Sequence, residues 1–289
     1  MSRPTGSKSG SLYLVATPIG NLEDVTLRAI RILRSVHMIA CEDTRRTRGL
    51  LTHFDIHTPL VSLHEHNERA RIPQVLRQLQ DGKDVALVSD AGMPTVSDPG
   101  AALVAAVAGA GLPVVSVPGA SAVTAAVALA GFSADQFVFV GFLPRRRADR
   151  TRLLTSLVSL PMALVIFEGP HRIRETLAEI EGVLGPRRVA LGRELTKMHE
   201  EVLRGTVGEV QAALGDTPRG EVTVVVEGNA GPGTAAVAAS AGGDPEAFIR
   251  RLLEAGLSRR DAARALAVAY GLRPREAYRI ASGSARKEK

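Results

Sequence analysis

Seven short apolar runs constrain the fold of this chain more than any other feature. They cover residues 12–16, 84–88, 113–117, 137–141, 163–167, 188–192 and 221–226. Several are apolar at consecutive positions, which is typical of strands covered on both faces. Helical patterns alternate with them. One, at 24–36, carries a stripe that includes Val25, Ile30 and Leu33, with Asp24 as its expected N-cap. This alternation predicts an α/β fold.

The domain organisation follows from where these patterns stop. We expect a disordered N-terminus at 1–11 and two α/β domains at 12–117 and 118–229. Residues 230–243 have almost no charge and no periodicity, which predicts a flexible linker. The remaining segment, 244–289, has the pattern of a small all-helical module.

The helical tail begins with Asp244 and Pro245, an N-cap and first-turn pair, and Ser258 and Asp261 resemble a capping box. Its helix, Gly turn, helix rhythm is that of a helix-turn-helix. It holds 11 Lys and Arg against 6 Asp and Glu, so it accounts for most of the net charge of +6. Two interpretations remain: a solvated helical cap or a nucleic-acid-binding module.

The composition of the chain indicates its cellular compartment and argues against a metal site. The single cysteine, Cys41, allows no internal disulfide and indicates a reducing compartment. The polar N-terminus predicts no secretory signal, and the Ala- and Val-rich stretch at 101–131 is broken by Gly, Pro and Ser. We therefore expect a cytoplasmic protein that does not engage a membrane. No Cys and His cluster has metal-ligand spacing, and the pair His64 and His66 lacks matching carboxylates, so we expect no metal.

Loops rich in Gly, Pro, Ser and Thr follow five of the predicted strands. They read TPIGNL, SDAGMPTVSDPG, PGASA, EGPHR and RELTKMHEE. Ligands of open α/β sheets bind beyond the carboxyl ends of the strands, so these loops predict one composite cleft. Neither GxGxxG nor GxxxxGK[ST] is present, which argues against a dinucleotide dehydrogenase or a P-loop NTPase. Glycines allow close backbone approach, which suits a ligand with adenine, ribose and an amino-acid tail.

Eight ordered motifs between residues 12 and 201 carry a specific resemblance. They are LYLVATPIGNLEDVTLRA, CEDTRRT, SLHEHNE, LVSDAGMPTVSDPG, VPGASA, FVGFLP, FEGPHRI and RELTKMHEE. The chain resembles the tetrapyrrole methylase superfamily and, within it, the ribosomal RNA small subunit methyltransferase I family. The small-molecule members usually carry a GPGD-like first loop and lack a basic helical tail, whereas this chain has TPIGNL and such a tail.

The resemblance implies two α/β domains with S-adenosylmethionine in the cleft between them, and a homodimer. It implies 2′-O-methylation of a cytidine ribose in the decoding region of 16S rRNA, with the 30S subunit as the expected partner. The implied donor contacts are Gly92, Met93, Val96, Ser121, Ala122, Leu195 and Thr196, with Pro18 near the methyl group on the acceptor side.

A ribose 2′-hydroxyl is a weak acid, so a base or a cation must help it to lose its proton. The candidates are Glu168, Lys197 and Glu200. Lys197 and Glu200 would share one face if RELTKMHEE begins a helix, and a lysine could stabilise the developing alkoxide or hold a phosphate. The alternative for this segment is a solvated helix start whose mixed charges pair with one another.

Basic residues outside the cleft suggest where RNA would be held. The candidates are Arg145, Arg146 and Arg147 in the run RRRADRTR, together with Arg259, Arg260, Arg273 and Arg275 in the tail. Two other functions stay open: a small-molecule methyltransferase of the tetrapyrrole kind, and a non-catalytic RNA-binding assembly factor that retains the fold.

Overall fold

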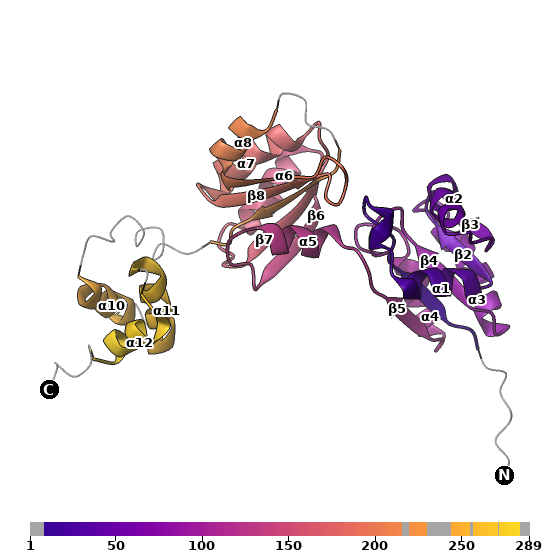
Figure 1. The fold of residues 1–289 in the computed structure, drawn as a ribbon, viewed down its shortest axis with the longest axis horizontal. Helices are drawn as coiled ribbons and strands as arrows, with labels where there is room; N and C mark the ends of the chain where they lie inside the picture. The colour runs from indigo at the N-terminus through magenta and orange to yellow at the C-terminus, as the bar shows by residue number, and fades with distance from the viewer. Residues whose placement is uncertain (1–8, 216–219, 230–243, 255–256, 271, 284–289) are drawn as a thin grey trace, which may run out of the picture. The chain divides into compact units, whose positions relative to one another are not determined.

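The computed structural model describes residues 9–215, 220–229, 244–254, 257–270 and 272–283 (Figure 1). The chain divides into two compact units. The first comprises residues 1–155 and 163–227, and the second comprises 156–162 and 228–289. The expected linker at 230–243 lies outside the described residues.

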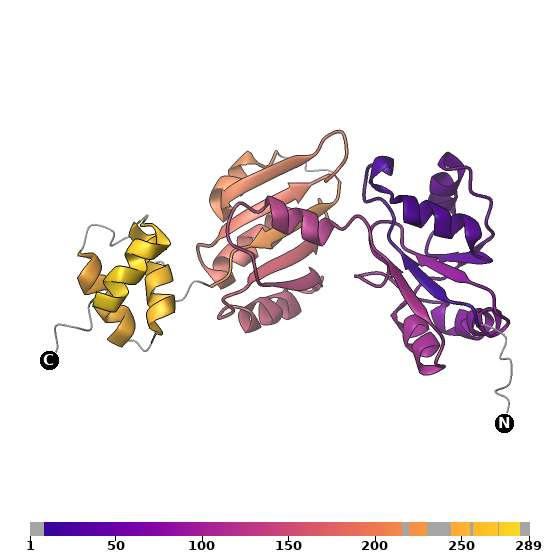
Figure 2. The ribbon, with the colours of Figure 1, turned by 60° about the horizontal axis from the view of Figure 1, so that its bottom comes forward.

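The first sheet of the first unit is fully parallel, with strand order β3-β2-β4-β1-β5. Its strands are β1 (Leu12–Val15), β2 (Met38–Cys41), β3 (Leu60–Ser62), β4 (Val85–Val88) and β5 (Val114–Val117). Its helices are the 3-10 turn η1 (Leu22–Asp24), α1 (Leu27–Ser35), α2 (Thr44–His53), α3 (Glu68–Gln80) and α4 (Ala101–Gly109). Figure 2 shows helices on both faces of this sheet.

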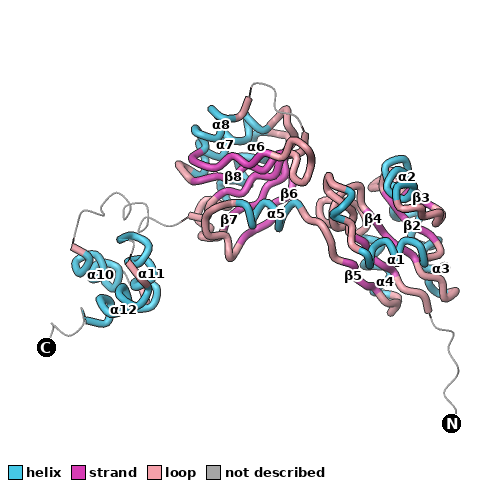
Figure 3. The backbone as a smooth tube through the Cα atoms, in the orientation of Figure 1, coloured by secondary structure: helices cyan, strands magenta, loops and turns pink. Residues whose placement is uncertain are grey.

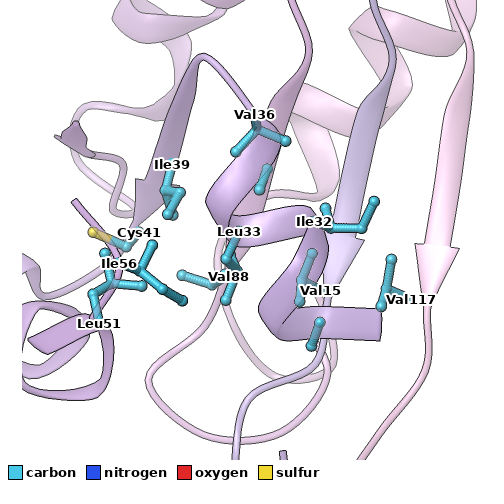
Figure 4. Close-up of a cluster of buried hydrophobic side chains, with 12 residues drawn as sticks. Val15, Ile32, Leu33, Val36, Ile39, Cys41, Leu51, Ile56, Val88 and Val117 are labelled. Carbon is cyan, nitrogen blue, oxygen red and sulfur yellow. The ribbon is translucent and has the colours of Figure 1, made fainter. Parts of the chain in front are cut away.

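Two buried clusters lie on opposite faces of the first sheet. Side chains of α1 and α2 pack with Val15 and Val88 in one of them (Figure 4). Side chains of α3 and α4 pack with Leu12 and Leu87 in the other. Neighbouring strand residues thus point to opposite clusters, which explains the continuous apolar runs of the central strands.

The second sheet is mixed, with order β6-β7-β10-β8-β9. Only β6 and β7 pair in parallel. Its strands are β6 (Phe137–Phe142), β7 (Ala163–Glu168), β8 (Arg188–Arg193), β9 (Glu201–Thr206) and β10 (Val222–Val226). The accompanying helices are α5 (Ala122–Leu129), α6 (Arg147–Ser156), α7 (Ile173–Leu184) and α8 (Val207–Ala213). Side chains of α5 pack against Val165, Ala190 and Val225 of the sheet.

The second unit is helical in its described residues, apart from its loops (Figure 3). It contains α10 (Pro245–Glu254), α11 (Arg259–Tyr270) and α12 (Pro274–Gly283), which share a core built around Ile249 and Leu266. The predicted caps are present. The Asp244 side chain accepts a hydrogen bond from the Glu246 amide, and the Ser258 hydroxyl accepts one from the Asp261 amide. The glycines expected to end α10 and to link α11 with α12 lie outside the described residues.

The structure confirms the α/β class and all seven predicted strands, and it adds β2, β3 and β9. Asp24 lies in η1, and the hydroxyl of Thr26 caps α1 by accepting the Ala29 amide, so the predicted N-cap was wrong. The expected disorder at 1–11 does not hold for Gly10 and Ser11, whose amides bond to the first unit. Within the described residues, no helix is long and apolar enough to cross a membrane.

Candidate functional site

A cavity of about 340 Å³ opens in the first unit. It is lined by segments that follow β1, β2 and β4, by the end of β6, by the end of β7 and the residues after it, and by the starts of α5 and β10. We name two walls. The loop wall consists of Ile19, Glu42, Arg46, Asp90, Ala91, Gly92, Met93, Val96, Ser97 and Asp98. The sheet wall consists of Ser121, Ala122, Val123, Phe142, Phe167, Glu168, Gly169, Pro170, Glu221, Val222 and Thr223.

The loop wall is held mainly by its own backbone. The Gly92 amide and carbonyl both bond to Thr17, at 3.1 and 2.9 Å, and the Ser89 hydroxyl donates to the Gly92 carbonyl at 3.1 Å. Thr95 and Ser97 have φ values of 72° and 64°, a left-handed conformation that side chains with a Cβ rarely adopt. Such conformations persist only where the surroundings fix them, and they cluster at ligand sites.

Three carboxylates meet on the loop wall. Asp90 is engaged, because it pairs with Arg46 at 3.3 Å and accepts the Asp43 amide at 3.2 Å. Glu42 and Asp98 form no ion pair with any described residue. Burial, followed by the charge of Glu42, raises the pKa of Asp98 to about 6. Burial and the charge of Asp90 also raise the pKa of Glu42. This wall therefore favours a positively charged ligand or a transferable proton.

Glu168, at the end of β7, is buried and fully engaged. Its two carboxylate oxygens accept from the guanidinium of Arg172, both at 2.8 Å. The Thr176 hydroxyl donates to it at 2.7 Å, and the Gly169 amide at 2.8 Å. Arg172 in turn donates to the Leu143 carbonyl at 3.0 Å. These four donors occupy the acceptor sites of the carboxylate, so Glu168 holds its neighbours in position.

RELTKMHEE forms two consecutive turns in place of the helix start that we expected. Glu194 and Thr196 have φ values of 51° and 67°. Lys197 pairs with Glu194 at 2.8 Å and with Glu221 at 3.6 Å, and the hydrogen bond that its ammonium donates to Glu194 raises the pKa of Lys197. Glu200 accepts the Thr196 amide at 2.6 Å. The predicted shared helix face of Lys197 and Glu200 was therefore wrong.

The structure places the predicted donor contacts in two groups. Gly92, Met93, Val96, Ser121 and Ala122 lie on the cavity walls. Pro18, Leu195 and Thr196 do not line the cavity, although Ile19 does and packs with the Leu195 cluster. A Cβ on Gly20 would stand 2.9 Å from the Leu195 carbonyl oxygen, so the loops that carry Ile19 and Leu195 are in contact.

The predicted catalytic residues separate in the same way. Glu168 lines the cavity, whereas Lys197 and Glu200 lie outside its lining; Lys197 pairs with Glu221, which lines it. Sequence reasoning missed Asp98 and Phe142 as lining residues. The signal for Asp98 was present, because it belongs to the same Gly- and Pro-rich loop as Gly92.

The predicted RNA contacts are all exposed. Arg145, Arg146 and Arg147 stand at the start of α6, and Arg259, Arg260, Arg273 and Arg275 lie at the starts of α11 and α12. Arg150, in the same run as the first three, is different. It is buried and pairs with Glu175 and Glu179 of α7, which anchors α6. Among the described residues no group of His, Cys, Asp and Glu could hold a metal ion.

Comparison with known proteins gives consistent matches. The family model described as Tetrapyrrole (Corrin/Porphyrin) Methylases matches residues 11–211. Three relatives named Ribosomal RNA small subunit methyltransferase I illustrate the sequence matches. The Bacillus subtilis protein is 47% identical over 77% of both chains. The Thermotoga maritima protein is 49% identical over 76% of this chain and 99% of its own, and the Synechocystis protein is 43% identical over 94% and 97%.

Solved structures match the same fold at low identity. A diphthine synthase has a TM-score of 0.60 at 15% identity, covering 75% of this chain and 90% of its own. A uroporphyrin-III C-methyltransferase from Thermus thermophilus, complexed with S-adenosyl homocysteine, has a TM-score of 0.53 at 19% identity. It covers 76% of this chain and 98% of its own.

Proposed function

Because the chain belongs to the ribosomal RNA small subunit methyltransferase I family within the tetrapyrrole methylases, we propose that it methylates the 2′-hydroxyl of a cytidine in the decoding region of 16S rRNA. It is an S-adenosylmethionine-dependent methyltransferase. The observation that carries the substrate proposal is 43% identity over 94% of the chain, which extends beyond the methylase fold into the helical tail.

The cavity suits the methyl donor. Its volume of about 340 Å³ falls within the range of small-molecule sites. When bound, S-adenosylmethionine supplies an electrophilic methyl group on a positively charged sulfur. Glu42 and Asp98 offer carboxylates without an ion pair, which complement that charge. We assign donor contacts to Gly92, Met93, Val96, Ser121 and Ala122, and we keep Leu195 and Thr196 as supports for Ile19 and Pro18 on the acceptor side.

The protein's part in the chemistry is to orient the hydroxyl and to take its proton. A displacement at a reactive methyl group gains much of its rate from positioning. Asp98 is the proton acceptor in this proposal, since it lines the cavity and its raised pKa makes it a better base than an exposed aspartate. Glu168 positions the sheet wall. Lys197 and Glu200 act from outside the lining, with Lys197 placed to hold a phosphate of the substrate.

We propose that RNA is held by the exposed arginines of α6 and of the helical tail. Few aromatic residues accompany them, so phosphate contacts provide most of this binding. We further propose that the working substrate is the 30S subunit, that the enzyme is a homodimer, and that it acts in the cytoplasm.

The first test is a methyl-transfer assay with the full-length protein and radiolabelled S-adenosylmethionine. The acceptors are unmethylated 30S subunits, free 16S rRNA and a tetrapyrrole precursor. Label on a cytidine 2′-oxygen of the 30S subunit supports the proposal. Label on the precursor alone overturns it in favour of a small-molecule methyltransferase, and binding of RNA without any transfer favours an assembly factor.

A second test addresses the tail. Replacing Arg259 and Arg260 with Gln should weaken binding to 30S subunits. It should also reduce the slope of the logarithm of affinity against the logarithm of salt concentration by the equivalent of about two phosphate contacts. The matched control replaces Arg28 and Arg31, two exposed arginines of α1, with Gln. Equal effects from both pairs would contradict a specific role for the tail.

A further inference from the structure

Phe142 is unusual among the aromatic residues of this chain. The chain has seven Phe, three Tyr and no Trp, so large rings are scarce. Phe142 nevertheless lines the cavity while 60% of it is exposed. Because the ring stands at the wall of the cavity, a ligand bound there would cover part of its exposed surface.

A one-residue bulge in β6 sets the direction of this ring. Phe139 pairs with Val165 of β7, but Gly141 pairs with Ile166 and Phe142 with Phe167, so Val140 is the extra residue. Without the bulge, Phe139 and Phe142 would point to opposite faces of the sheet. With it, both rings lie against Phe167, at centroid distances of 5.0 and 5.6 Å. The bulge thus turns Phe142 onto the cavity face.

The residues before and after Phe142 in the chain hold its backbone in this position. Gly141 has φ +73°, and a Cβ there would stand 3.1 Å from the Ser97 hydroxyl oxygen of the loop wall. On the other side, Leu143 is buried, and its carbonyl accepts the Arg172 guanidinium that Glu168 holds. The ring is exposed but its backbone is anchored, which is the property of a preorganised binding surface.

Cationic side chains follow immediately along the chain. Arg145, Arg146 and Arg147 are exposed. Arg145 follows Phe142 by three residues, so their backbones are at most about 10 Å apart. The buried pairs of Arg150 with Glu175 and Glu179 hold the helix that carries them. An aromatic face followed by a cluster of guanidinium groups is the combination that binds an unstacked nucleotide, by its base and by its phosphates.

We propose that Phe142 is the surface on which the base of the target nucleotide stacks, while Arg145, Arg146 and Arg147 bind the adjoining phosphates. This assignment rests on the proposed function. Stacking there would bring the ribose of that nucleotide to the cavity that holds the donor. It gives the single exposed ring of the cavity a role in positioning the acceptor.

The experiment compares Phe142→Ala, Phe142→Leu and Phe142→Tyr in the full-length protein. It measures kcat and KM for unmethylated 30S subunits, the Kd of the protein for those subunits, and the Kd for S-adenosylmethionine by calorimetry. Loss of a stacked base lowers affinity by roughly 5- to 100-fold. We expect Ala to raise KM and Kd for the subunit by that range, Leu to rescue little, and Tyr to restore most of the affinity. The Kd for S-adenosylmethionine should stay unchanged.

Phe137→Ala is the matched control, because Phe137 lies on the same strand, is also partly exposed and does not line the cavity. It should leave all four quantities unchanged. Full rescue by Leu, or no effect of Ala, would overturn the stacking role while the wild-type activity leaves the proposed function standing. A rise confined to the Kd for S-adenosylmethionine would instead assign the ring to the adenine of the donor. A wild-type protein that transfers no methyl to RNA would overturn the proposed function itself, and this assignment with it.

Discussion

The two walls of the cavity are built by different means. The loop wall places backbone groups and carboxylates through a segment with glycines, prolines and two left-handed side-chain-bearing residues, Thr95 and Ser97. The sheet wall places Phe142, Phe167 and Glu168 at the ends of two paired strands. In the loop wall the conformation of the chain itself forms the site, whereas in the sheet wall the site depends on which way strand residues point.

Substitutions in the two walls should therefore have different effects on stability and on ligand binding. A change at a buried residue of the sheet wall, such as Glu168, removes buried contacts, so it should act mainly on the stability of the fold, whereas a change at the exposed Phe142 should act on substrate binding. A change in the loop wall alters strain or charge, so it should act more on ligand binding and less on stability. Four substitutions separate these effects. Three change stability directly and run from the largest expected change to the smallest, and the fourth changes its pH dependence.

Glu168→Ala should lower the free energy of unfolding by about 3 kcal/mol, because it leaves the guanidinium of Arg172 without its carboxylate in a mostly buried position. Partial exposure of Arg172 keeps the cost at the low end of the range for buried pairs. Denaturant unfolding measures this. The control is Glu181→Ala on α7, an exposed carboxylate that forms no ion pair with the described residues. Equal stability of the two variants would contradict the anchoring role of Glu168.

Gly141→Ala should cost roughly 1–3 kcal/mol, because alanine is strained at φ +73° and its Cβ would crowd Ser97. Gly169→Ala is the control. Gly169 lies in the sheet wall, its φ is not positive and no atom stands within 4 Å of a Cβ there, so we expect the substitution to be neutral or slightly stabilising. Unfolding of Gly141→Ala at the same denaturant concentration as the wild type would contradict the expected strain at this position.

Thr95→Gly should raise the free energy of unfolding by about 0.5 kcal/mol. Glycine relieves a left-handed conformation that costs a side chain about 1–2 kcal/mol, and part of that gain is offset by its greater freedom in the unfolded chain. The same freedom should loosen the loop wall and weaken S-adenosylmethionine binding, which calorimetry measures. Thr95→Ala keeps the Cβ and should show no gain. A Thr95→Gly variant that is less stable than Thr95→Ala would show that the loop stores no strain at this residue.

The loop wall was also the easier one to predict from sequence. Gly92, Met93 and Val96 follow a buried apolar run within a loop of glycines and prolines. That pattern predicts a ligand site, and the family resemblance named these residues as donor contacts. Phe142 could not be predicted, because a single inserted residue decides which face of the sheet it points to, and periodicity does not reveal it. The same limit applies to β2, β3 and β9. Two of these strands are runs of three or four residues, and β9 is a partly exposed edge strand without a buried face.

The pH dependence of stability provides the test that is most specific to the loop wall. Burial raises the pKa of Asp98 to about 6 from its usual 3.8, so the folded protein binds this proton more tightly than the unfolded chain. The charge of Asp98 therefore destabilises the fold increasingly as pH rises from about 4 to 6, and the penalty is complete above that range. Asp98→Asn should unfold at a higher temperature than the wild type at pH 8, and the difference should disappear near pH 4.

Asp43 supplies the opposite case for this test. Its hydrogen bonds with Arg45 lower its pKa to about 2, so its charge stabilises the fold above pH 4, and that contribution is lost as pH falls toward 2. Asp43→Asn should therefore be slightly less stable than the wild type at pH 8, by a small amount because water screens this exposed pair. If Asp98→Asn and Asp43→Asn shift the unfolding temperature in the same direction at pH 8, the pKa of Asp98 is not raised by burial. The proposal that Asp98 accepts the proton would then be contradicted.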